Sequence, residues 1–440
     1  MLPVFKAALR GFNVVAVFAG LSCASALGWA QTAAGCAPGA SGALPVVDTG
    51  LPVVQIWTTA GAPILDRETY ITACMRISDG KLLPYQQGLF HGTIKIRGRG
   101  NSTWDMPKKG YRVKLDAAAP VLDMPSHKDW VLLANYADKT LLRNAAAMEL
   151  SRRVGMAWTP RLRHAEVYLN DEFLGNYLLG EKIEVAPQRV AITPMTSTDT
   201  ALPNLSGGYL IEADFIEYIA STDRYFTTAE GINFVMQSPS GSNVQGAQAS
   251  YISQYTQALE TAILSRNNLA GTGYPSLIDL DTVINWYIVQ ELTKNVDSPF
   301  GSSVYLYKDR NAVMKMGPLW DFDLAAGNVD YEPLAMGPTG WYVRTQSAWF
   351  SELFRDKAFK ARVKARWGVL KPQLQSMDAY ITAMELRLKN SQVENFRRWP
   401  ILDTWVWPNA VVLGSHHAEV AYLNDWLQQR IKWMDRNIGK

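Results

Sequence analysis

The chain has 440 residues, a formal net charge of +3, 48% apolar residues and 19% charged residues. This composition is that of a globular protein and excludes a disordered or collagen-like chain. The near-neutral charge excludes a protein that binds nucleic acid through bulk positive charge. The length accommodates one large domain or two to three smaller ones.

The first residues of the chain have the pattern of a targeting segment. Lys6 and Arg10 precede a short apolar stretch, and residues 1–30 contain no acidic residue. This order is typical of a secretory signal peptide, so we expect a secreted, periplasmic or cell-surface protein with no transmembrane span in the mature chain. Residues 31–50 are small and Gly/Pro-rich, which predicts a flexible linker.

Two cysteines remain after the predicted signal peptide, Cys36 and Cys74. An oxidising compartment allows them to pair, and two free thiols are the alternative. A lipid anchor on Cys36 is a third, less favoured interpretation.

The first half of the folded part is rich in strand patterns. Residues 51–57, 92–98 and 111–115 roughly alternate apolar and polar side chains. Asp138 is a suitable N-cap for a helix over about 139–153. After this helix, Asn170-Asp171 separates two β-rich runs, which predicts a hairpin.

Helical patterns dominate the second half. The expected helices cover about 251–266, 280–294, 346–366, 371–391 and 416–436. The fold class is therefore α+β, with a β-rich N-terminal lobe over 51–190 and a mainly helical C-terminal lobe over 191–440. A cleft between two lobes is the natural place for a ligand.

The first candidate site is a basic hairpin over residues 94–116. Cations on a hairpin suit a polyphosphate, whereas a solvated basic edge that discourages aggregation is the alternative. Its basic residues are Arg97, Arg99, Lys108, Lys109, Arg112 and Lys114.

Two further candidates are acidic. Asn295 and Asp297 follow a predicted helix, where ordinary helix-end chemistry is the alternative. Asp321 and Asp323 lie within an apolar run, and carboxylates there are costly unless they are paired, hydrogen-bonded or bound to a metal. If this segment is a strand, both carboxylates share one face and suit a hard dication such as Mg²⁺.

The three candidates together are the parts that phosphoryl transfer requires: cations for the phosphates, an Asp to orient the acceptor hydroxyl, and Asp or Asn to hold the metal. The Gly-rich loop and the His-Arg-Asp triplet of ordinary protein kinases are missing, so an ordinary kinase is excluded. Zinc-site spacings and the serine-hydrolase elbow are also missing.

The chain resembles the spore-coat CotH kinase family, an atypical protein-kinase-like group, over about residues 51–330. The matching stretches are RGRGNSTWDMPKKGYRVKL, KDWVLLANYADKTLLRN, VYLNDEFLGNYLLGEKIE, GGYLIEAD, ELTKNVDSP and GPLWDFDLAAGN. The resemblance implies a two-lobed kinase-like architecture, binding of ATP with Mg²⁺, and phosphorylation of Ser or Thr on a protein acceptor.

The resemblance also implies roles for individual residues. Asp297 would be the catalytic Asp, with Asn295 orienting it or contacting a metal. Asp321 would bind the metal, with Asp323 as a helper. For the cofactor, the resemblance implies that Lys109 contacts the phosphates, with Lys108 and Lys114 as rival candidates. Arg99 is the preferred arginine of the site, and Arg97 and Asn144 are weaker candidates. Glu181 would lie near the adenine or form an ion pair with the phosphate-contacting lysine.

Two other functions remain open at this point. A non-catalytic surface or coat protein on the same fold would use the 15 Trp and other aromatic residues as an adhesive face. Tyr331, Trp341 and Tyr342 are candidates for such exposure. A glycan-acting enzyme would use Asp321 and Asp323, which as strand neighbours on one face would lie roughly 6–7 Å apart.

Overall fold

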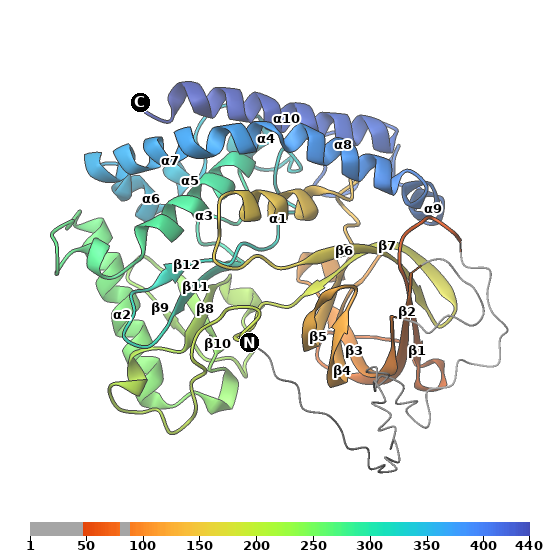
Figure 1. Ribbon diagram of the computed structural model, residues 1–440, viewed down its shortest axis with the longest axis horizontal. Coiled ribbons are helices and arrows are strands. Elements are labelled where there is room, and N and C mark those ends of the chain that lie inside the picture. The colour runs from red at the N-terminus through yellow and green to blue at the C-terminus, as the bar shows by residue number, and fades with distance from the viewer. Residues whose placement is uncertain (1–46, 80–88) are drawn as a thin grey trace, which may run out of the picture.

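The computed structural model describes residues 47–79 and 89–440 (Figure 1). The predicted signal peptide and Cys36 lie outside these residues, so the export signal, the pairing of Cys36 with Cys74 and the lipid anchor stay predictions. Cys74 itself is disulfide-bonded. In the described part of the chain, no helix has the length and apolar character that crossing a bilayer requires.

The N-terminal region is a closed barrel of seven strands in the order β1-β2-β3-β4-β5-β7-β6. The neighbours pair antiparallel, except that β1 and β6 close the barrel in parallel. The barrel strands are β1 (Val53–Thr58), β2 (Ile71–Ser78), β3 (Phe90–Arg99), β4 (Gly110–Val121), β5 (Met124–Leu133), β6 (Leu162–Leu169) and β7 (Glu172–Glu181).

Period-two alternation explains how the barrel strands fill their interior. Ile94 and Ile96 of β3 face the core together with Val113 and Leu115 of β4, and Trp130 joins them. The predicted turn at Asn170-Asp171 is confirmed: both residues have positive φ values, 49° and 67°, which suit a tight hairpin between β6 and β7.

The C-terminal region combines a second sheet with most of the helices. The sheet order is β12-β11-β8-β10-β9. Its strands are β8 (Tyr209–Ala213), β9 (Tyr225–Thr227), β10 (Asn233–Ser238), β11 (Val304–Lys308) and β12 (Lys315–Met316). The mixed α+β composition expected from the sequence is therefore present.

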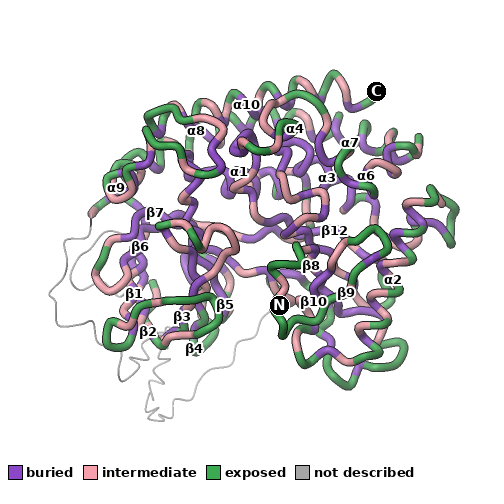
Figure 2. The backbone as a smooth tube through the Cα atoms, turned by 180° about the vertical axis from the view of Figure 1, so that it is seen from behind, coloured by how far each residue is buried: buried purple, intermediate pink, exposed green. Residues whose placement is uncertain are grey.

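Helices α1, α5, α7 and α10 pack against α3, which is buried along almost its whole length (Figure 2). Figure 1 shows α7, α8 and α10 lying along the side of the molecule opposite the second sheet. The helices are α1 (Arg143–Arg153), α2 (Gly246–Leu264), α3 (Leu280–Thr293), α4 (Pro333–Met336), α5 (Val343–Gln346), α6 (Ala348–Leu353), α7 (Lys357–Gln375), α8 (Met377–Leu388), α9 (Ser391–Arg398) and α10 (His416–Asn437).

The start of α1 differs from the expectation. Asp138 does not cap a helix from residue 139, because Leu141 has a positive φ of 59° and the helix begins only at Arg143. The Asp138 carboxylate nevertheless accepts a hydrogen bond from the Arg143 backbone N–H at 2.8 Å, and it forms a buried ion pair with the Arg143 guanidinium. Asp138 therefore stabilises the first turn of α1, although it precedes Arg143 by five residues in the sequence.

Candidate active site

One cavity, with a volume of about 390 Å³, brings together residues from distant segments of the chain. Four of the predicted site residues line it: Arg99, Asp297, Asp321 and Asp323. The other lining residues are Gly100, Asn101, Ser102, Thr103, Glu212, Asp214, Phe215, Tyr218, Val296, Ser302, Ser303, Tyr305, Trp320, Leu324, Tyr331 and Trp407.

Asp297 reaches the cavity because α3 ends sharply before it. Lys294 has a left-handed backbone, with φ 45°, which turns the chain at the end of α3. Its buried Nζ donates hydrogen bonds to the carbonyls of Leu334 at 2.7 Å and Gly337 at 2.8 Å, and also to that of Thr339. These bonds hold the turn that carries Asp297 against α4 and the segment that follows it.

The segment that carries Asp321 and Asp323 is not a strand. Asp321 has a positive φ of 59°, so the chain turns there and simple alternation does not place the two carboxylates. The Asp321–Phe322 peptide is held on both sides: Asn295 Nδ2 donates to the Asp321 carbonyl at 2.9 Å, and the Phe322 N–H donates to Asn144 Oδ1 at 2.8 Å. These two bonds offset the strained backbone at Asp321.

Asp323 is supported by a second pair of asparagines. Asn328 Nδ2 donates to the Asp323 carbonyl at 2.8 Å, and Asn409 Nδ2 donates to Asn328 Oδ1 at 2.9 Å. From α1, Arg143 Nε donates to the Ala325 carbonyl at 3.0 Å. The loop after Asp323 is therefore bonded both to α1 and to the C-terminal segment around residue 409.

Two carboxylates that the sequence analysis did not select also line the cavity: Glu212 and Asp214, at the end of β8. Gln237 Nε2 donates to Glu212 Oε2 at 2.8 Å, and Ser302 Oγ donates to Asp214 Oδ1 at 2.7 Å. The stretch GGYLIEAD contains the signal that could have found them, since two carboxylates two residues apart follow an apolar run, as at Asp321 and Asp323.

Burial and mutual repulsion make these carboxyl groups weaker acids. Burial, together with Asp321 and Asp214, raises the pKa of Asp297 to about 7. Burial, together with Asp214, raises the pKa of Glu212 to about 8. Burial also raises the pKa of Asp321 against the effect of Arg99, and burial with the Asp321 charge raises the pKa of Asp323 well above its usual range.

Among the described residues that line the cavity, Arg99 is the one basic side chain, against five carboxylates. Its guanidinium lies over the Trp320 ring, 5.4 Å from the ring centroid. Buried carboxylates repel one another, which is one reason why their pKa values are raised. A hard dication bound between them attracts all of them and thereby stabilises their charged forms. The donor set therefore fits Mg²⁺, with Asp321 and Asp323 as the residues that would hold it.

The comparison with known families agrees with this constellation. The family model described as CotH kinase protein matches residues 96–434. The chain belongs to the CotH kinase family. No curated protein matches it. The match includes the cavity-lining residues from Arg99 to Trp407, so the whole candidate site lies within the CotH domain.

The three lysines that the resemblance implied do not line the cavity of this CotH domain. Lys108 is buried, and its Nζ donates to Asn395 Oδ1 of α9 at 2.8 Å and to the Asn176 carbonyl. Lys109 Nζ donates to the Trp104 carbonyl, beside the loop over 100–103 that does line it. Lys114 is exposed on β4. Their phosphate-binding roles stay predictions.

The remaining predicted residues support the cavity or lie away from it. Asn295 is buried behind the cavity, where its amide holds the Asp321 carbonyl and its Oδ1 accepts from the Asp297 N–H at 3.4 Å. Glu181 is buried at the end of β7 and forms an ion pair with Arg161 at 2.9 Å. Its predicted contact with the adenine or with a lysine remains a prediction.

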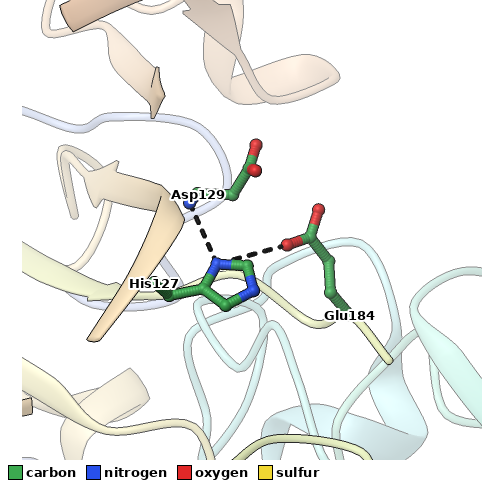
Figure 3. A group of neighbouring side chains, drawn as sticks. All are labelled: His127, Asp129 and Glu184. Atoms are coloured by element: carbon green, nitrogen blue, oxygen red, sulfur yellow. Dashed lines mark hydrogen bonds and ion pairs between the residues drawn. The ribbon is translucent and has the colours of Figure 1, made fainter. Parts of the chain in front are cut away.

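A second cluster of possible metal ligands lies outside the cavity: His127, Asp129 and Glu184 (Figure 3). Each of its two carboxylates already forms an ion pair with a basic side chain. Arg112 lies 2.9 Å from Asp129, and Lys182 lies 2.8 Å from Glu184. The cluster is better described as an ion-pair network between β5 and the segment after β7 than as a metal site.

Proposed function

We propose that this CotH-family protein is a two-lobed, kinase-like enzyme that binds Mg-ATP and transfers the γ-phosphate to a Ser or Thr hydroxyl of a protein. The observation that carries the proposal is the single cavity that contains Asp297, Asp321, Asp323 and Arg99. The barrel takes the place of the N-terminal kinase lobe, and the helical region takes the place of the C-terminal lobe. The cavity volume lies in the range of about 300–1,000 Å³ that is usual for small-molecule sites.

Each residue of the cavity has a role in this reaction. Arg99 binds phosphate oxygens through its guanidinium. Asp297 accepts the proton of the acceptor hydroxyl while the hydroxyl oxygen bonds to the γ-phosphorus and the bond to the β–γ bridging oxygen breaks, releasing ADP. A base with a pKa of about 7 is well matched to this transfer near neutral pH. Mg²⁺, when bound to Asp321 and Asp323, would neutralise phosphate charge.

The proposal is tested with Asp297→Asn and Asp321→Asn, against Asp425→Asn, an exposed position on α10, as the matched control. The measurements are the thermal shift caused by Mg-ATP and the transfer of labelled phosphate to a mixture of Ser- and Thr-containing peptides of varied sequence. Asp297→Asn should keep the thermal shift and lose transfer by about 100-fold or more, as removal of a general base does. Asp321→Asn should lose both.

Two results would contradict the proposal. Transfer at the parental rate in both variants would show that these aspartates have other roles. A parental protein with no thermal shift in Mg-ATP would favour the non-catalytic coat or surface protein.

We also propose that the protein is exported by residues 1–30 and that its acceptor is an extracellular or coat protein. The support is the basic and apolar pattern of that segment. Expression of the full chain, followed by fractionation and sequencing of the mature N-terminus, tests this. An uncleaved chain confined to the cytosol would contradict it.

A further inference from the structure

Four aromatic side chains form the mouth of the cavity, and we call them the aromatic rim: Phe215, Tyr218, Tyr331 and Trp407. Each is between 39% and 49% exposed. Phe215 and Tyr218 pack edge to face with ring centroids 5.9 Å apart, whereas Tyr331 and Trp407 stack almost parallel at 5.8 Å. Single exposed apolar residues are normal on a surface, but a group of them around one cavity marks a binding surface.

The aromatic rim and the proposed catalytic base, Asp297, line the same cavity. Burial and the nearby charges of Glu217 and Asp297 raise the pKa of Tyr218. Burial and the charge of Asp297 raise the pKa of Tyr331 to about 12. One tyrosine from each aromatic pair is therefore within electrostatic reach of Asp297, so a hydroxyl that approaches Asp297 brings its neighbouring groups against the rim.

The segment of the rim that carries Trp407 is held in place by the same bonds that hold Asp323. Asn409 Nδ2 donates to the Ala137 carbonyl at 2.6 Å and to Asn328 Oδ1, and Asn328 donates to the Asp323 carbonyl. Trp407 lies two residues before Asn409, and Trp405 Nε1 donates to the Asn409 carbonyl at 3.0 Å. A surface that is already ordered loses little conformational entropy when a ligand binds to it.

The charges around the rim are mostly negative. The cavity contains five carboxylates and one guanidinium. Next to the rim residues in the chain are Glu217, Asp330 and Glu332, and the charges of Asp330 and Glu332 act on Tyr331. An acceptor with acidic side chains beside its hydroxyl would meet repulsion here, whereas an apolar side chain would gain aromatic contact.

We propose that the aromatic rim determines acceptor specificity: it binds an extended polypeptide in which the accepting Ser or Thr is flanked by a large apolar side chain and not by acidic ones. This inference rests on the proposed phosphotransfer and adds the sequence class of the acceptor. Tyr331 and Trp407 provide the stacked surface for the flanking side chain. Tyr218 and Phe215 complete the mouth of the same cavity.

The test uses peptides of one length with a single Ser whose neighbours are Phe, Leu, Ala or Glu, assayed with Mg-ATP. We expect kcat/KM for the Phe and Leu peptides to exceed that of the Ala peptide by about tenfold, as burial of a large apolar side chain gives. The Glu peptide should be the poorest. Trp407→Ala and Tyr331→Ala should raise KM for the Phe peptide about tenfold and for the Ala peptide less than threefold, which removes the preference.

The controls separate this inference from the proposed function. Tyr225→Ala removes an aromatic residue that is 44% exposed on β9 and does not line the cavity, so it should keep the parental preference. Tyr331→Phe keeps the ring and should restore the preference. Equal kcat/KM across the peptides, or an unchanged preference in Trp407→Ala, would overturn the specificity while phosphotransfer stands.

An oligosaccharide acceptor is assayed in parallel, because aromatic surfaces also bind sugars. Transfer to sugar in place of peptide would overturn the inference. A Mg-ATP thermal shift with no transfer to any acceptor would overturn the proposed transfer together with the inference.

Discussion

Asn144 on α1 accepts a hydrogen bond from the backbone N–H of Phe322, with 2.8 Å between Asn144 Oδ1 and the nitrogen. Phe322 is fully buried, and it lies between the two aspartates that we propose to hold the metal. This bond connects the first turn of α1 to the loop over residues 321–323, which we call the acidic loop, across 178 residues of sequence. It makes Asn144 a positioning residue for Asp321 and Asp323.

Removal of this bond should loosen the acidic loop. Asn144→Ala leaves the buried Phe322 N–H without a partner, which costs about 1–3 kcal/mol. We expect the Mg²⁺ concentration for half-maximal transfer to rise about tenfold, with a smaller change in the KM for ATP, because small displacements of reacting groups are costly. Activity titrated with Mg²⁺ at saturating ATP measures this.

Asn135→Ala is the matched control for Asn144. Asn135 is also a buried asparagine, and its Oδ1 accepts a hydrogen bond from Asn144 Nδ2 at 3.2 Å. Among the described residues, no side-chain hydrogen bond joins Asn135 to residues 321–323. Its effect on the Mg²⁺ requirement should be the smaller of the two. Equal effects of both variants would show a general loss of packing instead of a positioning role.

Arg99 should contribute more to nucleotide binding than its neighbour on β3, Arg97. Arg99→Gln removes the one guanidinium that lines the described cavity, and a hydrogen bond to a charged group contributes about 1.5–3 kcal/mol. The KM for ATP should therefore rise about 10- to 100-fold. Arg97 stacks on Tyr70 and does not line the cavity, so Arg97→Gln is the control.

The same measurement of the KM for ATP compares Arg99 with Lys109, the residue that the resemblance favours for contacting the phosphates. A larger effect of Lys109→Gln than of Arg99→Gln would show that the loop over 100–109 rearranges when nucleotide binds. A change below twofold in Arg99→Gln would remove Arg99 from the phosphate site.

Glu212 should make stability depend on pH. Its pKa is raised from 4.5 to about 8 in the folded protein, first by burial and then by Asp214. Between these values the unfolded chain has released the proton that the folded chain still binds, so the free energy of unfolding falls as the pH rises through this window. Below pH 4.5 both states are protonated and this penalty is absent.

Glu212→Gln resembles the protonated side chain at every pH. Thermal unfolding without divalent metal should give similar melting temperatures for parent and variant near pH 5 and a higher one for the variant near pH 8.5. Glu217→Gln, at an exposed position beside the same cavity, is the control. A difference between parent and Glu212→Gln that does not change with pH would refute the prediction.

Lys108 should matter for stability through the contact between the barrel and α9. Burial lowers the pKa of Lys108 to about 7, and its Nζ bonds Asn395 of α9 and the Asn176 carbonyl of β7. Lys108→Met removes the donor to the buried Asn176 carbonyl, whereas Asn395 Oδ1 keeps the Asn176 N–H as a donor at 3.1 Å. The loss of this donor should lower the free energy of unfolding by about 1–3 kcal/mol. Lys114→Met, on the exposed side of β4, should change it by less than about 0.5 kcal/mol.

Denaturant unfolding of the two variants compares them directly. If Lys108→Met unfolds no earlier than Lys114→Met, the buried contacts of Lys108 do not hold the barrel to α9.

The local patterns of the sequence were sufficient for β1, β3, β4, the β6–β7 hairpin, α3, α10 and the acidic candidates, whereas β2 and the strands β9 to β12 were not predicted. Alternation in residues 92–98 and 111–115 predicts β3 and β4 because a barrel strand buries every second side chain. Asp321 and Asp323 could be selected without a structure because carboxylates in an apolar run require a partner. The selection of Asp297 rests on its place after a predicted helix and on the resemblance to the CotH family.

Tertiary structure alone decided which candidates share one cavity. Lys108 and Lys109 are adjacent in sequence, yet one is buried against α9 and the other lies at the Trp104 carbonyl, since the direction of each side chain depends on what packs against the hairpin. The sharp turn at Asp321 depends on Asn144 and Asn295, which lie far from it in sequence. Glu212, Asp214 and the aromatic rim meet the acidic loop only because the chain brings β8 and the segment around residue 407 to the same cavity.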